Sequence, residues 1–214
     1  MVADHQTAGR GRLGRSWLSE PGRNLLFSIV LRPTLPKETS SFLTFFSAVF
    51  IARALEKITG HDVECKWPND VLVNGKKCCG ILLENSFARE SLEFSVVGIG
   101  INVNQSVFGP ELEGRATSLA TEYGVTYDRT SLLQALLREA DSLLPSIAKG
   151  YSGTIMEEWN KRCTLFGKSI TVMHGDEAIS GTAVSLNGDG GLIIQTPDGR
   201  KTVYAGDVTV ISDK

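Results

Sequence analysis

The sequence predicts an α+β fold in which strands and helices mix along residues 1–164 and a small all-β barrel follows at residues 165–214. Before Phe166, segments with strand-like alternation and segments with helical periodicity follow one another. After Phe166 the chain holds only short strand-like runs separated by turn residues. An apolar content of 42% indicates a packed core rather than a disordered chain.

The first predicted elements are a strand and a long helix. Leu25–Leu31 is an apolar run with the length of a strand. Prolines follow it and break the run. A helix is expected to begin after Ser40 or Ser41 and to reach about Ile58, with Gly60 as its C-terminal stop.

A β-hairpin is the clearest local prediction. Asn74-Gly75 is a two-residue turn signal between the strand-like runs Val71–Val73 and Lys77–Glu84. The run before the hairpin, Val63–Trp67, alternates in character and ends in the turn Pro68-Asn69-Asp70.

The remaining elements are a further strand, two helices and the strands of the barrel. Pro145 is expected to bend or end the first of the two helices. In chain order we expect a strand at Phe94–Val103, helices at Arg129–Ala148 and Ser152–Cys163, and barrel strands at Ile170–Met173, Ala178–Ser185, Leu192–Thr196, Lys201–Tyr204 and Val208–Ile211.

Composition excludes several classes of protein. A formal net charge of −2 argues against a dedicated binder of nucleic acid or of anionic membranes, and no segment resembles a helix-turn-helix. No apolar run reaches the roughly 20 residues that a membrane helix needs, and the first residues lack a signal-peptide core, so we expect a cytoplasmic protein. The four cysteines form no C-x-x-C pair, so we expect reduced thiols rather than a zinc site.

A Gly/Arg segment near the N-terminus is the first candidate site. Residues 9–17 read Gly-Arg-Gly-Arg-Leu-Gly-Arg-Ser-Trp, with arginines at 10, 12 and 15. Guanidinium forks suit phosphate and carboxylate oxygens, glycines let the backbone approach a ligand, and Trp17 offers a flat surface. The alternatives are a solvated loop or an RNA-binding segment, although no second basic cluster accompanies it.

The second and third candidates are polar positions at strands. Lys66 lies on the face opposite Cys65 and Trp67, at the end of a strand, so it can reach into a pocket; a snorkelling surface lysine is the alternative. Gly98, Gly100 and Asn102 share one face of their strand and leave a bare strip for a flat ligand; the alternative is a β-bulge or close backbone packing. No G-x-G-x-x-G fingerprint or P-loop is present.

Taken together, these motifs resemble the biotin-protein ligase family. The matching segments are Gln6-Thr7-Ala8-Gly9-Arg10-Gly11-Arg12, Gly14-Arg15-Ser16-Trp17, Lys66-Trp67-Pro68-Asn69-Asp70, Cys79-Gly80-Ile81-Leu82-Leu83-Glu84 and Gly98-Ile99-Gly100-Ile101-Asn102-Val103-Asn104. The resemblance covers essentially the whole chain. It implies a mixed central β-sheet with flanking helices, as in class II synthetases, followed by an SH3-like barrel.

The resemblance also implies roles for individual residues. Biotin would be contacted by Gln6, Gly9, Arg10, Gly11, Arg12, Lys66, Gly80, Gly98 and Gly100. The nucleotide would be contacted by Arg12, Arg15, Trp17 and Asn102, and catalysis would rest on Lys66, Arg10 and Arg12. ATP, biotin and Mg²⁺ are the implied cofactors, and the sequence identifies no magnesium ligands.

The implied reaction joins biotin to ATP as biotinyl-5′-AMP and then transfers biotin to a lysine of a biotin carboxyl carrier protein of acetyl-CoA carboxylase. Family members carry a further strand and helix before the Gly/Arg segment, ending in Thr-Asn, and Met1 stands only five residues before Gln6. We therefore expect this chain to lack that part of the catalytic domain. The alternatives are a protein that holds biotin or biotinyl-adenylate without transferring it, and an acyl-transfer enzyme for lipoate or octanoate. A homodimer is expected by analogy alone.

Overall fold

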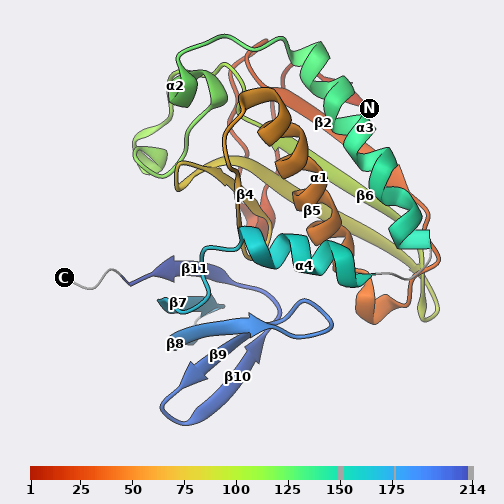
Figure 1. Cartoon of the computed structure of the whole chain (residues 1–214), viewed down its shortest axis with the longest axis vertical. Coiled ribbons are helices and arrows are strands. Elements are labelled where there is room, and N and C mark those ends of the chain that lie inside the picture. Colours follow the sequence, from red (N-terminus) through yellow and green to blue (C-terminus); the bar gives the residue numbers. More distant parts are fainter. Residues whose placement is uncertain (149–151, 176, 212–214) are drawn as a thin grey trace.

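The computed structural model describes residues 1–148, 152–175 and 177–211. The last residues of the predicted second domain, 212–214, therefore lie outside the described part of the chain. The chain forms two sheets with helices on and beside the first of them (Figure 1).

The first sheet has six strands in the order β1-β2-β6-β5-β4-β3. Among the described residues, every pairing between its named strands is antiparallel, so the expectation of a mixed sheet is wrong. The reason is that β3 to β6 form a meander joined by short turns, which reverses direction at each step. The strands are β1 (Val2–Ala3), β2 (Leu25–Leu31), β3 (Glu64–Lys66), β4 (Asp70–Val73), β5 (Lys76–Ala88) and β6 (Ser91–Ile101).

The turns of this sheet follow the sequence signals. Asn74 has φ 51° and Gly75 has φ 74°, the pair of positive angles that a type I′ hairpin turn requires, so the predicted hairpin is confirmed. The strand predicted at Leu25–Leu31 has those bounds in the structure. A cis peptide bond joins Trp67 and Pro68.

Two long helices lie on one face of the first sheet (Figure 1). α1 (Phe42–Thr59) is buried along most of its length and ends at Gly60, whose φ of 74° is left-handed, as predicted. α3 (Arg129–Ala148) packs beside it and is capped by Asp128, whose Oδ1 accepts from the backbone N–H of Ser131 at 2.8 Å. Pro145 lies inside α3 rather than ending it. The other helices are α2 (Leu119–Tyr123) and α4 (Ser152–Arg162).

The second sheet has five strands in the order β10-β9-β8-β7-β11, all paired antiparallel. Since β10 and β11 are its two edges, its closure into the expected barrel stays a prediction. The strands are β7 (Ser169–His174), β8 (Glu177–Leu186), β9 (Leu192–Thr196), β10 (Gly199–Val203) and β11 (Asp207–Val210).

The turn between β8 and β9 joins the second sheet to the first part of the chain. The Ser41 hydroxyl donates to the carbonyl of Asp189 at 3.0 Å, and the indole Nε1 of Trp67 donates to the carbonyl of Gly190 at 3.0 Å. Gly190 has φ 82° and lies against the Phe45 ring. A Cβ atom at position 190 would overlap this ring. The two parts of the molecule therefore share a packed interface at this turn.

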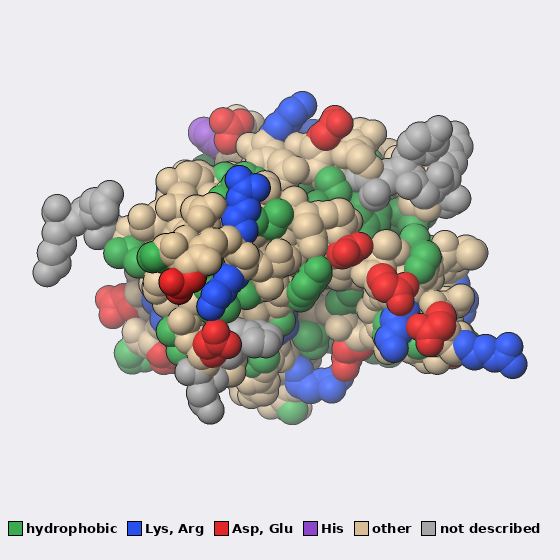
Figure 2. Space-filling model, turned by 90° about the horizontal axis from the view of Figure 1, so that it is seen from below, with side chains coloured by type: hydrophobic (Ala, Val, Ile, Leu, Met, Phe, Trp, Pro, Cys, Tyr) green, Lys and Arg blue, Asp and Glu red, His purple; other side chains and the backbone are tan. Residues whose placement is uncertain are grey.

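The surface carries charges of both signs. Figure 2 shows the end of the molecule seen from below in Figure 1, where Lys and Arg side chains are interspersed with Asp and Glu side chains. A face with charges of both signs has no extended positive potential that would attract a polyanion. None of the described helices is both long and apolar enough to cross a membrane.

The packed turn predicts a contrast between two glycines. Gly190→Ala should lower the free energy of unfolding by about 1–3 kcal/mol, because the new methyl group overlaps Phe45 and takes a left-handed φ. Gly188→Ala is the control, since nothing lies within 4 Å of a Cβ at that position. Urea unfolding of the two variants measures the difference. Equal stabilities would contradict the packing described for this turn.

Candidate functional site

A single row of residues crosses the open face of the first sheet, opposite α1. Lys66 on β3 stands directly across the ladder from Asp70 on β4, and Asp70 stands directly across from Gly80 on β5. Gly80 pairs with Gly100, which in turn pairs with Leu26. Since directly paired residues point to the same face, the row has charged groups at one end and no side chains at its centre.

The indole of Trp17 lies on the bare centre of this row. A Cβ on Gly100 would be 2.5 Å from the indole Cε2, and a Cβ on Gly80 would be 2.8 Å from Cζ3. Gly98 sits one row further along, where a Cβ would come no closer than 3.5 Å, to the carbonyl of Leu82. The strip that receives a flat ring is therefore formed by Gly80 and Gly100, which we call the glycine strip.

Residues 9–17, the Gly/Arg loop, form a closed hairpin rather than an extended segment. Gly11 N donates to Arg15 O at 2.7 Å, and Trp17 N donates to Gly9 O at 2.9 Å. A short 3₁₀ turn at Arg12–Gly14 makes the tip of the loop. The fold of the loop places Trp17 on the glycine strip and its arginines against neighbouring parts of the protein.

Each arginine of the loop contacts a different element. Arg12 is partly buried, and burial lowers the pKa of its guanidinium while the charges of Asp207 and Asp70 oppose that shift. Polar contacts of all three arginines hold the loop against the rest of the protein. The contacts are Arg10 Nη2 to Glu84 Oε1 of β5 at 3.1 Å, Arg12 Nη1 to Asn69 Oδ1 at 3.0 Å, and a two-point ion pair between Arg15 and Asp207 of β11.

Two lysines flank Asp70 beside the glycine strip. Lys66 is partly buried, which lowers its pKa, and the nearby carboxylate of Asp70 opposes the shift. Lys77 Nζ lies 2.7 Å from Asp70 Oδ1 and 5.8 Å from the centre of the Trp17 ring. It would be 3.5 Å from a Cβ on Gly80, so Lys77 faces the strip directly.

No sequence motif singled out Lys77, and the structure shows why. Lys77 and Gly80 are three residues apart, so regular alternation would place them on opposite faces. The pairing of β4 with β5 shifts by one residue here: Val71 faces Cys79, whereas Leu72 faces Lys77. Cys78 is the extra residue of this bulge, which turns Lys77 onto the open face.

A cavity of about 380 Å³ lies beside the Gly/Arg loop. Gln6, Gly9 and Trp17, three residues predicted to bind ligands, line it together with the buried Gln105. Among the described residues, Trp17 Nε1 and Ser19 Oγ are buried without a hydrogen-bond partner, and Trp17 Nε1 lies against the glycine strip at Gly100. The cavity therefore brings together three of the predicted ligand-binding residues beside the Gly/Arg loop.

Asn102, predicted to contact adenine, is only 4% exposed. Its Nδ2 donates to the carbonyl of Thr117 at 3.0 Å, and its backbone N donates to the carbonyl of Cys78 at 2.8 Å. The side-chain N–H thus holds the segment that leads into α2. Contact with a base stays a prediction for this residue.

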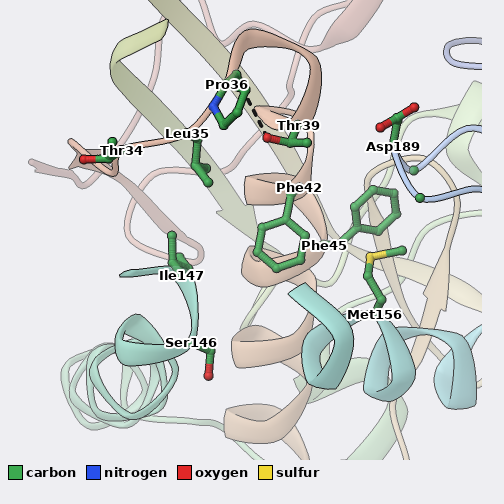
Figure 3. Close-up of a pocket in the computed structure, with 12 residues that line it drawn as sticks. Thr34, Leu35, Pro36, Thr39, Phe42, Phe45, Ser146, Ile147, Met156 and Asp189 are labelled. Atoms are coloured by element: carbon green, nitrogen blue, oxygen red, sulfur yellow. Dashed lines mark hydrogen bonds between the residues drawn. The ribbon is translucent and has the colours of Figure 1, made fainter. Parts of the chain in front are cut away.

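A second cavity, of about 260 Å³, carries none of the predicted site residues. Leu35, Phe42, Phe45, Ile147 and Met156 make it mostly apolar (Figure 3). It lies between α1, the end of α3, α4 and the β8–β9 turn, on the helical side of the sheet. Its chemistry does not match that of the Gly/Arg loop and the glycine strip, which we take as the candidate site.

The cysteines lie apart from this chemistry. Cys65, Cys78 and Cys79 are buried, and burial raises the pKa of Cys78 to about 12 and that of Cys163 to about 11. Thiols with raised pKa values are poor nucleophiles at neutral pH. Within the described residues, no cluster of three or more His, Cys, Asp or Glu side chains could hold a metal ion.

Comparisons with known proteins match both parts of the chain. Residues 1–102 match the biotin/lipoate A/B protein ligase family, and residues 165–210 match the biotin protein ligase C-terminal domain. The chain is 32% identical over 220 residues to the biotin–[acetyl-CoA-carboxylase] ligase of Paracoccus denitrificans, covering 97% of this chain and 88% of that protein. It is 34% identical over 210 residues to the bifunctional ligase/repressor BirA of Bacillus subtilis, covering 97% of this chain and 65% of that protein's length.

A solved structure shows the same fold. The biotin protein ligase of Aquifex aeolicus in complex with biotin and ATP has a TM-score of 0.83 and 34% identity to this chain, over 99% of this chain and 88% of that one. The α+β architecture predicted from the sequence is thereby confirmed, apart from the direction of its strands.

The glycine strip yields a test that needs no knowledge of the ligand. Gly100→Ala should displace the Trp17 indole, because a Cβ there would be 2.5 Å from the ring. Trp67 and Trp159 are buried, so acrylamide quenching of tryptophan fluorescence reports mainly on Trp17 and should increase. Gly98→Ala is the matched control and should quench like the wild type. Equal quenching in both variants would contradict the stacking of Trp17 on the strip.

Proposed function

This chain belongs to the biotin protein ligase family, and we propose that it activates biotin with ATP to biotinyl-5′-AMP and transfers biotin to a lysine of a carrier protein. The observation that supports this most is the open face of the first sheet. There the glycine strip, on which the Trp17 indole lies, borders Lys66 and Lys77, and the Gly/Arg loop adds Arg10 and Arg12.

The electrostatics of that face match the first half-reaction. Biotin's carboxylate must attack the α-phosphate of ATP, and two anions repel each other. Cations already fixed beside the reacting groups lower this cost without reorganising during the reaction. Arg12 and Lys66 are partly buried, where their charges are screened less by water than on the open surface.

The proposed division of the site follows its geometry. Gln6 and Gly9 would border the biotin rings beside the cavity, Gly11 would lie near the biotin carboxylate, and Gly80, Gly98 and Gly100 would lie beneath the ligand. Arg10, Arg12 and Lys66 would hold the carboxylate and the α-phosphate, and Lys77 joins this group on the evidence of its position over the strip. Arg15, Trp17 and Asn102 would face the nucleotide. Residues 1–164 would form the catalytic domain and residues 165–214 a second domain.

Three further assignments belong to this proposal. Mg²⁺ would be held mainly by the phosphates and by water, as is usual where a protein offers few carboxylates. It would supply charge neutralisation on the transferring phosphate. A carboxyl carrier protein is the proposed acceptor, because the Paracoccus denitrificans relative is named a ligase of acetyl-CoA carboxylase. A homodimer is proposed by analogy with the family alone, and a cytoplasmic location on the sequence alone.

The first experiment incubates the purified chain with biotin, MgATP and a biotin carboxyl carrier domain, and measures the acceptor's mass. We expect a gain equal to one biotin that depends on ATP. Tight binding of biotin without any gain in the acceptor's mass would favour a binding protein that does not transfer biotin over a ligase. A gain with lipoate and none with biotin would replace biotin as the substrate.

The two lysines can be separated by substitution. Lys66→Ala and Lys77→Ala should each slow biotin-dependent release of pyrophosphate by roughly 10- to 100-fold, the effect of losing one charge-assisted contact. We expect the larger loss for Lys77→Ala, because Nζ of Lys77 lies over the strip. Circular dichroism checks that both variants fold. Wild-type turnover in Lys66→Ala would remove Lys66 from the proposed machinery.

Arg12 should govern retention of the activated intermediate. Arg12→Ala should speed the release of biotinyl-adenylate roughly 10- to 100-fold, since a contact between a guanidinium and a phosphate contributes about 1.5–3 kcal/mol. The rate is measured by rapid filtration of labelled intermediate. Arg200→Ala, an exposed arginine on β10, is the control. An unchanged release rate in Arg12→Ala would contradict its assigned contact.

A further inference from the structure

One contact joins the Gly/Arg loop to the second sheet. Arg15 Nη1 donates to Asp207 Oδ1 at 3.0 Å, and Nη2 pairs with Oδ2 of the same carboxylate. The two residues are 192 positions apart in the sequence. Bidentate pairs of this kind fix the orientation of the guanidinium as well as its position.

The carboxylate of Asp207 is presented from a rigid position. Asp207 opens β11 and pairs with Met173 of β7. The preceding Gly206 has φ 148°, and a Cβ there would lie 2.6 Å from the carbonyl of Met173. The backbone on the N-terminal side of Asp207 is therefore packed closely against β7, so the second sheet supplies a fixed anchor.

The same sheet also contacts the other cationic motif. Trp67, which directly follows Lys66, donates to the carbonyl of Gly190 at 3.0 Å. The charge of Asp207 acts on both Arg12 and Lys66 and opposes the fall in pKa that burial causes at each. The second sheet therefore reaches both segments from which the site takes its cations.

We propose that Asp207 is a positioning residue of this site, which holds the Gly/Arg loop closed over the glycine strip through Arg15. The inference rests on the proposed function. Arg15 keeps further N–H groups free while Asp207 uses two of them, so the same guanidinium can hold a phosphate oxygen at the same time. The second domain thus contributes to nucleotide binding through a residue that does not contact the nucleotide.

Because this ion pair is exposed, its effect on the loop can be measured apart from its effect on global stability. The side chains of Arg15 and Asp207 are 64% and 39% exposed. Such exposed pairs contribute little to global stability. Loss of the pair should therefore open the loop while leaving the midpoint of thermal unfolding unchanged.

The test compares Asp207→Asn with Glu177→Gln, a control on β8 of the same sheet. Without substrates, trypsin should cleave the loop of Asp207→Asn after Arg12 or Arg15 about two- to fivefold faster than that of the wild type, the range expected for an exposed ion pair. Asp207→Glu, which keeps the charge, should recover most of the protection. The control should be cleaved at the wild-type rate. Equal cleavage of Asp207→Asn and the wild type would overturn the proposal.

Kinetics provide the second readout. In the presence of biotin, Asp207→Asn should raise the KM for MgATP by a similar factor of about two to five, with kcat changed less. A fall in that KM would overturn the proposal, because Asp207 would then compete with the nucleotide for Arg15. If the wild type shows no biotin-dependent turnover, the proposed function fails, whereas the cleavage rates still decide whether Asp207 holds the loop.

Discussion

The site depends on a place where the sheet has no side chains. Gly80 and Gly100 stand opposite each other on β5 and β6, and the flat face of Trp17 rests on their backbone. Any larger residue at either position would lift a ring off the sheet. The cations then have a defined floor beside which to gather, and the Gly/Arg loop has a surface on which to close.

Three cations at or beside the site form ion pairs with carboxylates of the protein. Arg10 contacts Glu84, Lys77 contacts Asp70, and Arg15 contacts Asp207. These pairs offset the repulsion among like charges and hold the side chains in place. Charges that are oriented before the reaction stabilise developing charge better than charges that must first turn toward it.

The sequence predicted what local rules control. The Asn74-Gly75 hairpin and the helix that ends at Gly60 follow from turn chemistry and periodicity, and both are confirmed. β1 and α2 escaped notice because two and five residues are too short to show a period. The family and its fold were recognisable because several motifs occur in a fixed order.

The parts that sequence reasoning missed depend on tertiary geometry. Lys77 reaches the open face only because Cys78 bulges, and a bulge of this kind leaves no clear mark in the pattern of residues. Asp207 meets Arg15 across 192 positions, a pairing that no local rule describes. Strands β3 to β6 are antiparallel because short turns connect them in succession, whereas the resemblance implied a mixed sheet.

The contacts of the second sheet also shape how the molecule unfolds. Trp67 and Arg15 belong to the first part of the chain, yet their partners, Gly190 and Asp207, belong to the second. A ligand that orders the Gly/Arg loop therefore binds best when both parts are folded and docked. By mass action such a ligand couples their unfolding, so that two parts of one chain melt together as a single cooperative unit when the site is filled.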